Sequence, residues 1–206
     1  MAEITAEMVR QLREKSGAGM LDCKKALDAS KGDVNKAMDR LRERGQAKAQ
    51  QKSSRATKQG RIHSYIHHTG TVGVLLEINC ETDFVARNPE FHELASNISM
   101  HIAARAPRYV SRNEIPDVVI EKEKSIYRTL ALNEGKPEKV VDKIAEGRLV
   151  KFFEEYCLLD QAYVREEKMT IGELIQQKIA KVGENITVRR FVRYQLGETI
   201  ETMEVA

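Results

Sequence analysis

The stretch TVGVLLEINCETDFVARNPEFHELASNI, residues 71–98, carries three patterns in succession. Residues 72–78 form a nearly continuous apolar run, which indicates a buried strand. Asn88 and Pro89 then open a segment whose apolar residues recur at helical spacing, so a helix is predicted that ends at Pro107. Residues 77–87 connect the two elements. The stretch therefore predicts a chain that mixes strand and helix.

The strand at 72–78 is expected to pair with the segment before it. Ile62, Ser64 and Ile66 alternate with polar or amphipathic neighbours, and residues 67–70 supply the turn of a β-hairpin. Strands separated by several helices, without regular βαβ units, favour an α+β core in which helices pack on a small antiparallel sheet. The remaining predicted elements are helices over 117–133, 137–156 and 170–182 and strands over 158–164 and 186–196.

The first 45 residues carry helical patterns only. Thr5 is placed to cap a first helix that stops at Ser16-Gly17, and a second helix is predicted over 21–32. Asp33 is placed to cap a third helix, which is predicted to end at Gly45. Three helices in this length predict a small three-helix bundle over residues 1–45.

A basic segment follows the bundle. Residues 40–61 contain eight basic residues and one acidic residue, although the whole chain has a net charge of only +3. Large apolar residues are missing after Leu41, so a basic linker is predicted over 46–60, between the bundle and a core over 61–206. RNA binding is the alternative role for this segment. No aromatic residue is interleaved in it and it matches no nucleic-acid motif, so no direct nucleic-acid partner is expected.

The composition limits the class of protein. The 206 residues are 41% hydrophobic and 5% aromatic, which is typical of a globular, helix-rich chain. No stretch approaches the ~20 apolar residues of a membrane helix, so no membrane partner is expected. The acidic start MAEITAE lacks the features of a secretory signal, which predicts a cytoplasmic protein. Three widely spaced cysteines without a C-x-x-C motif indicate free thiols: Cys23, Cys80 and Cys157.

Two kinds of reactive site are conceivable on residue types alone. Cys80, a histidine and Asp83 could form a cysteine hydrolase, and cysteines with His63, His67 or His68 could hold zinc. The spacing supports neither, so no catalytic residue, metal or cofactor is predicted.

Two loops present residues that admit two interpretations. Met20 and Leu21 follow a flexible turn at 17–19, and they either pack beneath the bundle or lie exposed on it. Asp83 and Phe84 lie at the turn from strand to helix. Physical reasoning favours Asp83 as a local helix cap, and the alternative is that the acid and the aromatic ring both project from a surface loop.

Three motifs together resemble one family. Residues 12–27, LREKSGAGMLDCKKAL, are similar to the N-terminal signature of the elongation factor Ts family, and residues 77–87 resemble its second signature around TDFV. Residues 183–190, GENITVRR, also resemble that family. The resemblance covers essentially the whole chain.

The resemblance implies a guanine-nucleotide exchange factor that binds the translational GTPase elongation factor Tu and speeds release of GDP so that GTP can bind, without being a GTPase itself. The N-terminal bundle would be a ubiquitin-associated-like module that docks on the nucleotide domain of the partner through Arg13, Met20 and Leu21. Leu21 departs from the Met that is often found there, but this swap conserves volume and apolar character.

The resemblance also assigns the core residues. Asp83 and Phe84 would insert beside the nucleotide and disturb its magnesium ion and phosphate loop. The whole turn implied as partner-binding is Thr82, Asp83, Phe84 and Val85, and the further implied contacts are His67 or His68, Val182 and Gly183.

Longer members of the family carry two core subdomains and a coiled-coil insertion. This chain has room for one core and shows no long heptad run. A homodimer is therefore predicted, in which two chains supply the paired cores.

Overall fold

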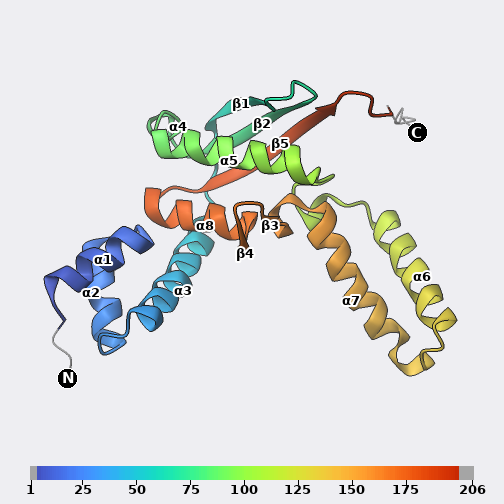
Figure 1. Ribbon diagram of the computed structural model, residues 1–206, viewed down its shortest axis with the longest axis horizontal. Coiled ribbons are helices and arrows are strands. Elements are labelled where there is room, and N and C mark those ends of the chain that lie inside the picture. The colour runs from blue at the N-terminus through green and yellow to red at the C-terminus, as the bar shows by residue number, and fades with distance from the viewer. Residues whose placement is uncertain (1–3, 200–206) are drawn as a thin grey trace. The chain divides into compact units, whose positions relative to one another are not determined.

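The computed structural model describes residues 4–199 (Figure 1). This part of the chain contains eight α-helices, two short 3-10 turns and five strands. The strands form a three-stranded sheet in the order β1-β2-β5 and a two-stranded sheet of β3 and β4. The predicted α+β class is confirmed. The helices are α1 (Ala6–Ser16), α2 (Met20–Ala29), α3 (Val34–Lys52), α4 (Asp83–Ala86), α5 (Pro89–Arg105), α6 (Asp117–Asn133), α7 (Glu138–Tyr156) and α8 (Ile171–Val182), and the strands are β1 (Gln59–Ile66), β2 (Val72–Cys80), β3 (Ala162–Tyr163), β4 (Glu166–Thr170) and β5 (Ile186–Gln195).

The chain divides into two compact units. The first unit contains the residues up to Arg61 together with Ile78–Leu94 and Glu173–Thr187. The second unit contains Ile62–Glu77, Ala95–Gly172 and the chain from Val188 onward.

Helices α1, α2 and α3 of the first unit form the predicted three-helix bundle. The side chain of Thr5 caps α1, Gly17 ends it with a φ of 67°, and Asp33 caps α3 by accepting a hydrogen bond from the Lys36 N–H. These caps satisfy backbone groups that a helix end leaves unpaired. The core of the bundle consists of Val9, Leu12, Cys23, Ala26, Leu27 and Ala37.

Helix α3 continues beyond Gly45 to Lys52, so the predicted end at Gly45 is wrong. The residues that follow Gly45 are mostly Ala, Gln and Lys, whose helix propensity outweighs the cost of about 1 kcal/mol for one interior glycine. Asp22 of α2 forms ion pairs with Arg44 at 3.2 Å and with Lys48 at 2.7 Å, and these two residues lie on either side of the glycine. Ala49 is buried. Tertiary contacts thus hold the first half of the predicted basic linker in a helix.

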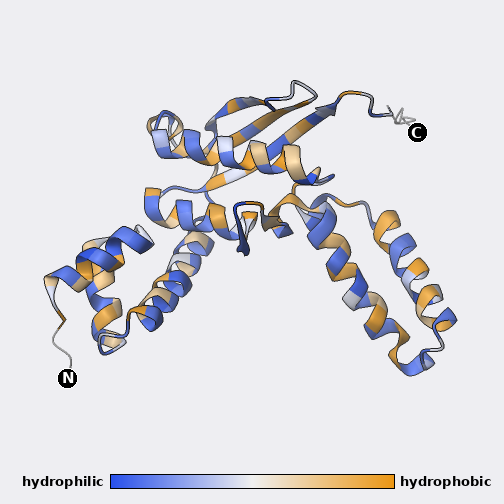
Figure 2. Cartoon of the chain, in the orientation of Figure 1, coloured by the Kyte–Doolittle hydropathy of each residue, from blue (hydrophilic) through white to orange (hydrophobic). Residues whose placement is uncertain are grey.

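The three-stranded sheet has one buried and one exposed face. On β2, Val74 and Leu76 are buried, whereas Leu75 between them is 47% exposed. Helix α5 runs along the sheet (Figure 1), and Arg193 of β5 donates a hydrogen bond to the carbonyl oxygen of Ala103 in α5. Apolar residues recur along β2 and β5 (Figure 2). The buried face of α5 is the predicted one, formed by Phe91, Leu94, Ala95, Ile98 and Ile102.

Helices α6 and α7 of the second unit pack against each other as a helical hairpin, joined by a short loop (Figure 1). Both helices were predicted. Their pairing was not predicted, because the sequence of this region shows no long heptad repeat. The predicted strand at 158–164 begins as a 3-10 turn over Leu158–Asp160, and only Ala162–Tyr163 is strand. Its partner β4 was missed, because its sequence EEKMT offers no apolar alternation. In the described part of the chain, no helix is long and apolar enough to cross a membrane.

Candidate partner-binding site

The segment Thr82–Val85 forms a short turn of helix between β2 and α5. Thr82 is its N-cap, since the Thr82 Oγ1 accepts a hydrogen bond from the Val85 N–H at 3.4 Å. The expectation that Asp83 is the cap is therefore wrong. Asp83 instead lies on the surface and pairs with Arg87 at 3.0 Å.

Burial separates the apolar residues of this turn. Val85 and Ala86 point inward and are buried, whereas Phe84 is 79% exposed. A short helix can bury only one side, and the two smaller residues occupy it. The aromatic ring of Phe84 is left projecting into solvent, where it is available to a partner.

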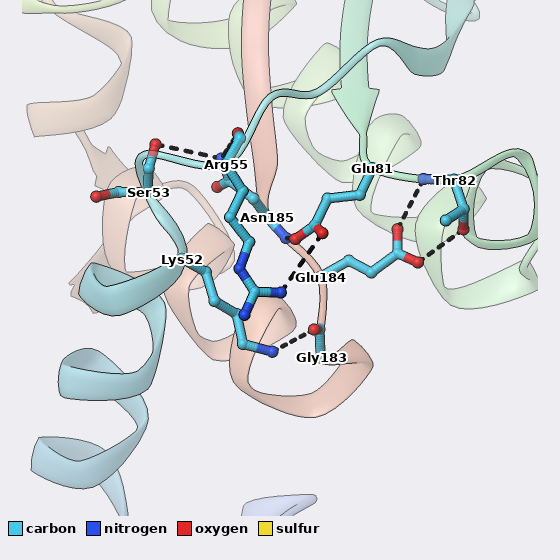
Figure 3. A network of polar contacts seen from close by, with 8 residues as sticks. All are labelled: Lys52, Ser53, Arg55, Glu81, Thr82, Gly183, Glu184 and Asn185. Atoms are coloured by element: carbon cyan, nitrogen blue, oxygen red, sulfur yellow. Dashed lines mark hydrogen bonds and ion pairs between the residues drawn. The ribbon is translucent and has the colours of Figure 1, made fainter.

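Residues from a distant segment hold the turn in place (Figure 3). One carboxylate oxygen of Glu184 accepts the Thr82 N–H at 3.0 Å, and the other accepts the Thr82 hydroxyl at 2.7 Å. Asn185 is buried, and its own N–H donates to the Glu81 carboxylate at 2.7 Å. The Lys52 ammonium donates to the carbonyl oxygen of Gly183. The Glu184 side chain therefore binds the backbone of Thr82, and the Glu81 side chain binds the backbone of Asn185.

Cys80 lies beneath this turn. Its thiol donates to the Thr82 carbonyl oxygen at 3.1 Å, and burial raises the pKa of the Cys80 thiol to about 11. A thiol with this pKa stays protonated near neutral pH, whereas a reactive cysteine acts as its thiolate. Among residues 4–199, no three His, Cys, Asp or Glu side chains come together as a metal site.

The predicted docking residues of the N-terminal bundle lie on its surface. Arg13 is exposed, Met20 is 47% exposed and Leu21 is 64% exposed. The alternative that Met20 and Leu21 pack beneath the bundle is wrong. They form the first turn of α2, whose buried face begins at Cys23.

The bundle and the end of α8 share one hollow within the first unit. Gly17 lies close to Lys181, since a Cβ atom at Gly17 would be 3.5 Å from the Lys181 side chain. Lys181 directly precedes Val182 and Gly183, and its ammonium pairs with Glu90 at 2.7 Å. The fold therefore brings Arg13 and Met20 of the bundle to the same hollow as Lys181, which directly precedes the predicted segment at 182–183. The hollow is lined by Arg10, Arg13, Glu14, Gly17, Met20 and Lys181.

The two histidines lie at the tip of the β1–β2 hairpin in the second unit. His67 is half-buried, and its Nδ1 shares a hydrogen bond with the Tyr65 hydroxyl at 2.9 Å. His68 is exposed, with its ring centroid 4.2 Å from that of His67. Of the two, His68 has the freer surface.

Several residues of the site were not predicted, among them Lys181, Glu184 and Asn185. Glu184 and Asn185 stand in the motif GENITVRR, which indicated the family without assigning either a role. Their polar character immediately before an apolar strand was the available signal. Their partners Thr82 and Glu81 are about a hundred residues away, so the sequence alone could not pair them.

Taken together, the fold and the site define an α+β chain that carries exposed apolar and basic side chains on a helical bundle and an exposed aromatic ring on a hydrogen-bonded turn. Comparison with known proteins identifies its kind. The family model described as elongation factor TS matches residues 2–198, and the chain belongs to the elongation factor Ts family. The resemblance predicted from the three motifs is confirmed.

Individual relatives match over nearly their whole length. The elongation factor Ts of Thermodesulfovibrio yellowstonii is 59% identical over 196 residues, which cover 95% of this chain and 98% of the relative. That of Solibacter usitatus is 56% identical over 198 residues, covering 96% and 93%. That of Fervidobacterium nodosum is 56% identical over 196 residues, covering 95% and 100%.

Proposed function

We propose that this chain acts on elongation factor Tu through the turn Thr82–Val85, with Phe84 as the group that enters the nucleotide site of the partner. Membership of the elongation factor Ts family makes the chain a guanine-nucleotide exchange factor of translation elongation, which promotes release of GDP so that GTP can bind. The observation that carries the assignment to this turn is the 79% exposure of Phe84 on a backbone held by hydrogen bonds.

The exchange needs no covalent chemistry from the chain. Magnesium and phosphate contacts contribute much of the free energy with which a GTPase holds GDP. A side chain that displaces these ligands raises the dissociation rate of the nucleotide. By linkage, a factor that weakens GDP binding is itself bound more weakly by the GDP-loaded partner, so it leaves once a nucleotide rebinds. The chain is thus proposed to be an exchange factor and not an enzyme in the bond-making sense.

The exposed residues of the bundle would supply binding energy away from the nucleotide. Met20 and Leu21 offer apolar area, and Arg13 offers a cation for an acidic group of the partner. Val182 and Gly183 would add backbone and apolar contacts, and His67 or His68 a contact at the hairpin tip. We further propose a helical docking module that extends to the end of α3 at Lys52, a short basic connection to β1 and an α+β core, together with a cytoplasmic location, where protein synthesis takes place.

The test is release of a fluorescent GDP analogue from purified elongation factor Tu. A substoichiometric amount of the chain is expected to accelerate release of the whole bound pool, because each molecule acts repeatedly. Phe84→Ala is expected to bind the partner and to accelerate release far less. Undiminished exchange by Phe84→Ala would show that another residue acts as the wedge.

We also propose that the chain works as a homodimer, paired through the exposed face of the three-stranded sheet. Cross-strand pairing places Leu75 of β2 on the same face as Val192 of β5, since Glu77 and Arg190 pair on these strands at 2.7 Å. Contiguous exposed apolar area of this kind marks an interaction surface, and a two-fold axis would bring two copies of the same face together. This sheet face consists of Ile62, Ile66, Leu75, Val192, Tyr194 and Leu196, all at least 42% exposed.

A further inference from the structure

We propose that Glu184 is a positioning residue for exchange: its carboxylate fixes the turn that carries Phe84. The proposal rests on the function assigned to that turn above. Glu184 itself lies in the loop between α8 and β5, and it grips Thr82, two residues before Phe84.

The two hydrogen bonds of Glu184 settle the orientation of Thr82. The Thr82 hydroxyl donates its hydrogen to the Glu184 carboxylate at 2.7 Å. A lone pair of the hydroxyl oxygen is thereby left to accept the Val85 N–H. A second bond at 3.0 Å from the Thr82 N–H prevents rotation about the first. Both hydrogen bonds are to a charged acceptor and are stronger than neutral ones.

Phe84 needs this support because its own packing is small. With 79% of its surface exposed, the ring makes few contacts that could hold the backbone around it. The helix α4 has only four residues, so intrahelical hydrogen bonds contribute little. The direction of the ring is therefore set by the neighbouring residues of the turn, Thr82 on one side and the buried Val85 on the other.

The loop that carries Glu184 is itself anchored (Figure 3). Asn185 is 2% exposed, and its side-chain amide donates to the carbonyl oxygens of Ser53 at 3.3 Å and Arg55 at 2.8 Å. Its N–H binds Glu81, which also pairs with Arg55 at 3.5 Å. Two successive residues of each loop are thus cross-linked, Glu81 to Asn185 and Thr82 to Glu184.

This arrangement joins the two segments that are each proposed to contact the partner, Val182–Gly183 and Thr82–Val85. Glu184 directly follows Val182 and Gly183, so its hydrogen bonds to Thr82 tie the proposed docking segment to the turn. Docking at Val182–Gly183 would then place Phe84 in a defined position on the partner. A loose turn would still let the chain bind, but the ring would spend less time in the orientation that displaces the nucleotide ligands.

The variant Glu184→Gln tests the proposal with little change in size. Its amide presents one acceptor and one donor, so one of the two Thr82 donors meets an N–H group. The matched control is Glu43→Gln, which removes the same charge from an exposed position of α3. We expect the rate of GDP release at saturating Glu184→Gln to fall about tenfold, and the half-saturating concentration to change less than about threefold. Glu43→Gln is expected to change neither.

A second measurement on the free chain needs no partner. Hydrogen exchange of the Thr82 amide, followed by NMR, is expected to be faster in Glu184→Gln than in the unmodified chain or Glu43→Gln. The melting temperature of the variant is expected to stay close to that of the control, because Glu184 lies at the surface of the core.

The outcomes separate this proposal from the one on which it depends. An unmodified chain that fails to accelerate GDP release overturns the proposed function. Normal exchange by the unmodified chain, with an unchanged saturating rate for Glu184→Gln, overturns the positioning role alone. So would a loss confined to the half-saturating concentration, which would make Glu184 an ordinary contact, or an unaltered exchange of the Thr82 amide.

Discussion

Phe84 and Phe91 lie seven residues apart and have opposite environments. Phe91 is fully buried on α5, whereas Phe84 is 79% exposed on α4. Both follow an apolar strand and both could belong to the core on hydrophobicity alone. The difference is geometric, because α5 is long enough to bury a whole face, while the four-residue α4 buries only Val85 and Ala86.

This contrast gives a stability prediction for each ring. Phe91→Ala removes a fully buried side chain and is expected to cost about 3 to 5 kcal/mol of the free energy of unfolding. Phe84→Ala is expected to leave the denaturation midpoint nearly unchanged. Urea denaturation of both variants decides the matter, and a large loss for Phe84→Ala would place that ring in the core.

A second residue-scale prediction concerns His101, which is buried on α5. Its Nε2 donates to the Gln161 Oε1 at 2.9 Å, and its Nδ1 accepts the Val164 N–H at 3.4 Å, so the neutral ring fits the site. Burial lowers the pKa of His101, an effect to which the nearby Arg105 adds and which the bond to Gln161 opposes.

The folded protein therefore holds His101 neutral at a pH where the unfolded chain is already protonated. Its contribution to stability is complete above the unfolded pKa of about 6.5 and is lost as the pH falls below that value. We expect the melting temperature to drop between pH 7 and pH 5, and the drop to be smaller in His101→Gln. An equal drop in both proteins would assign the effect to other groups.

At the scale of elements, α3 continues past the glycine at which the sequence predicts its end. Gly45 was a reasonable terminator, but Asp22 pairs with Arg44 and Lys48 on both sides of it. Lys52, in the last turn, reaches the Gly183 carbonyl oxygen. The segment that remains without regular structure between α3 and β1 is residues 53–58.

Limited trypsin digestion checks this boundary. The first cuts are expected after Arg55 and Lys58, because proteases act on exposed, non-helical backbone. Lys48 and Lys52 lie in α3 and are expected to be cut later. Early fragments ending at Lys48 would show that the second half of α3 unfolds easily, and mass spectrometry of the fragments distinguishes the cases.

At the scale of the whole molecule, the exposed sheet face is the proposed surface of association. Five of its six apolar residues belong to β1, β2 and β5, and Leu196 directly follows β5. All six lie in the second unit, so a single charged substitution would disturb a second copy without entering the core. Burying a glutamate against this face without a partner is costly.

Sedimentation over a range of concentrations tests the homodimer. Tyr194→Glu is expected to shift the chain from dimer to monomer at micromolar concentration. Val118→Glu is the control, since it adds the same charge to a 74% exposed apolar residue of α6, outside the sheet face. A monomeric unmodified chain at every concentration, alone and with the partner, would contradict the proposal.

The local elements were determined by the sequence itself. The caps at Thr5 and Asp33, the buried face of α5 and the β1–β2 hairpin depend on residues within a few positions of one another. The motifs at residues 12–27 and around TDFV, with GENITVRR in support, indicated the family. Such signals can be recognised in a sequence because helix caps, helical periodicity and turns depend on interactions between residues close together along the chain.

Only the tertiary structure decided which of these residues form a working surface. The exposure of Phe84, the continuation of α3 past Gly45 and the pairing of the unpatterned β4 with β3 all depend on what packs beside them. The grip of Glu184 on Thr82 joins residues 102 positions apart. No local propensity encodes such a contact, because its free energy arises only after folding has brought the two loops together and removed their alternatives.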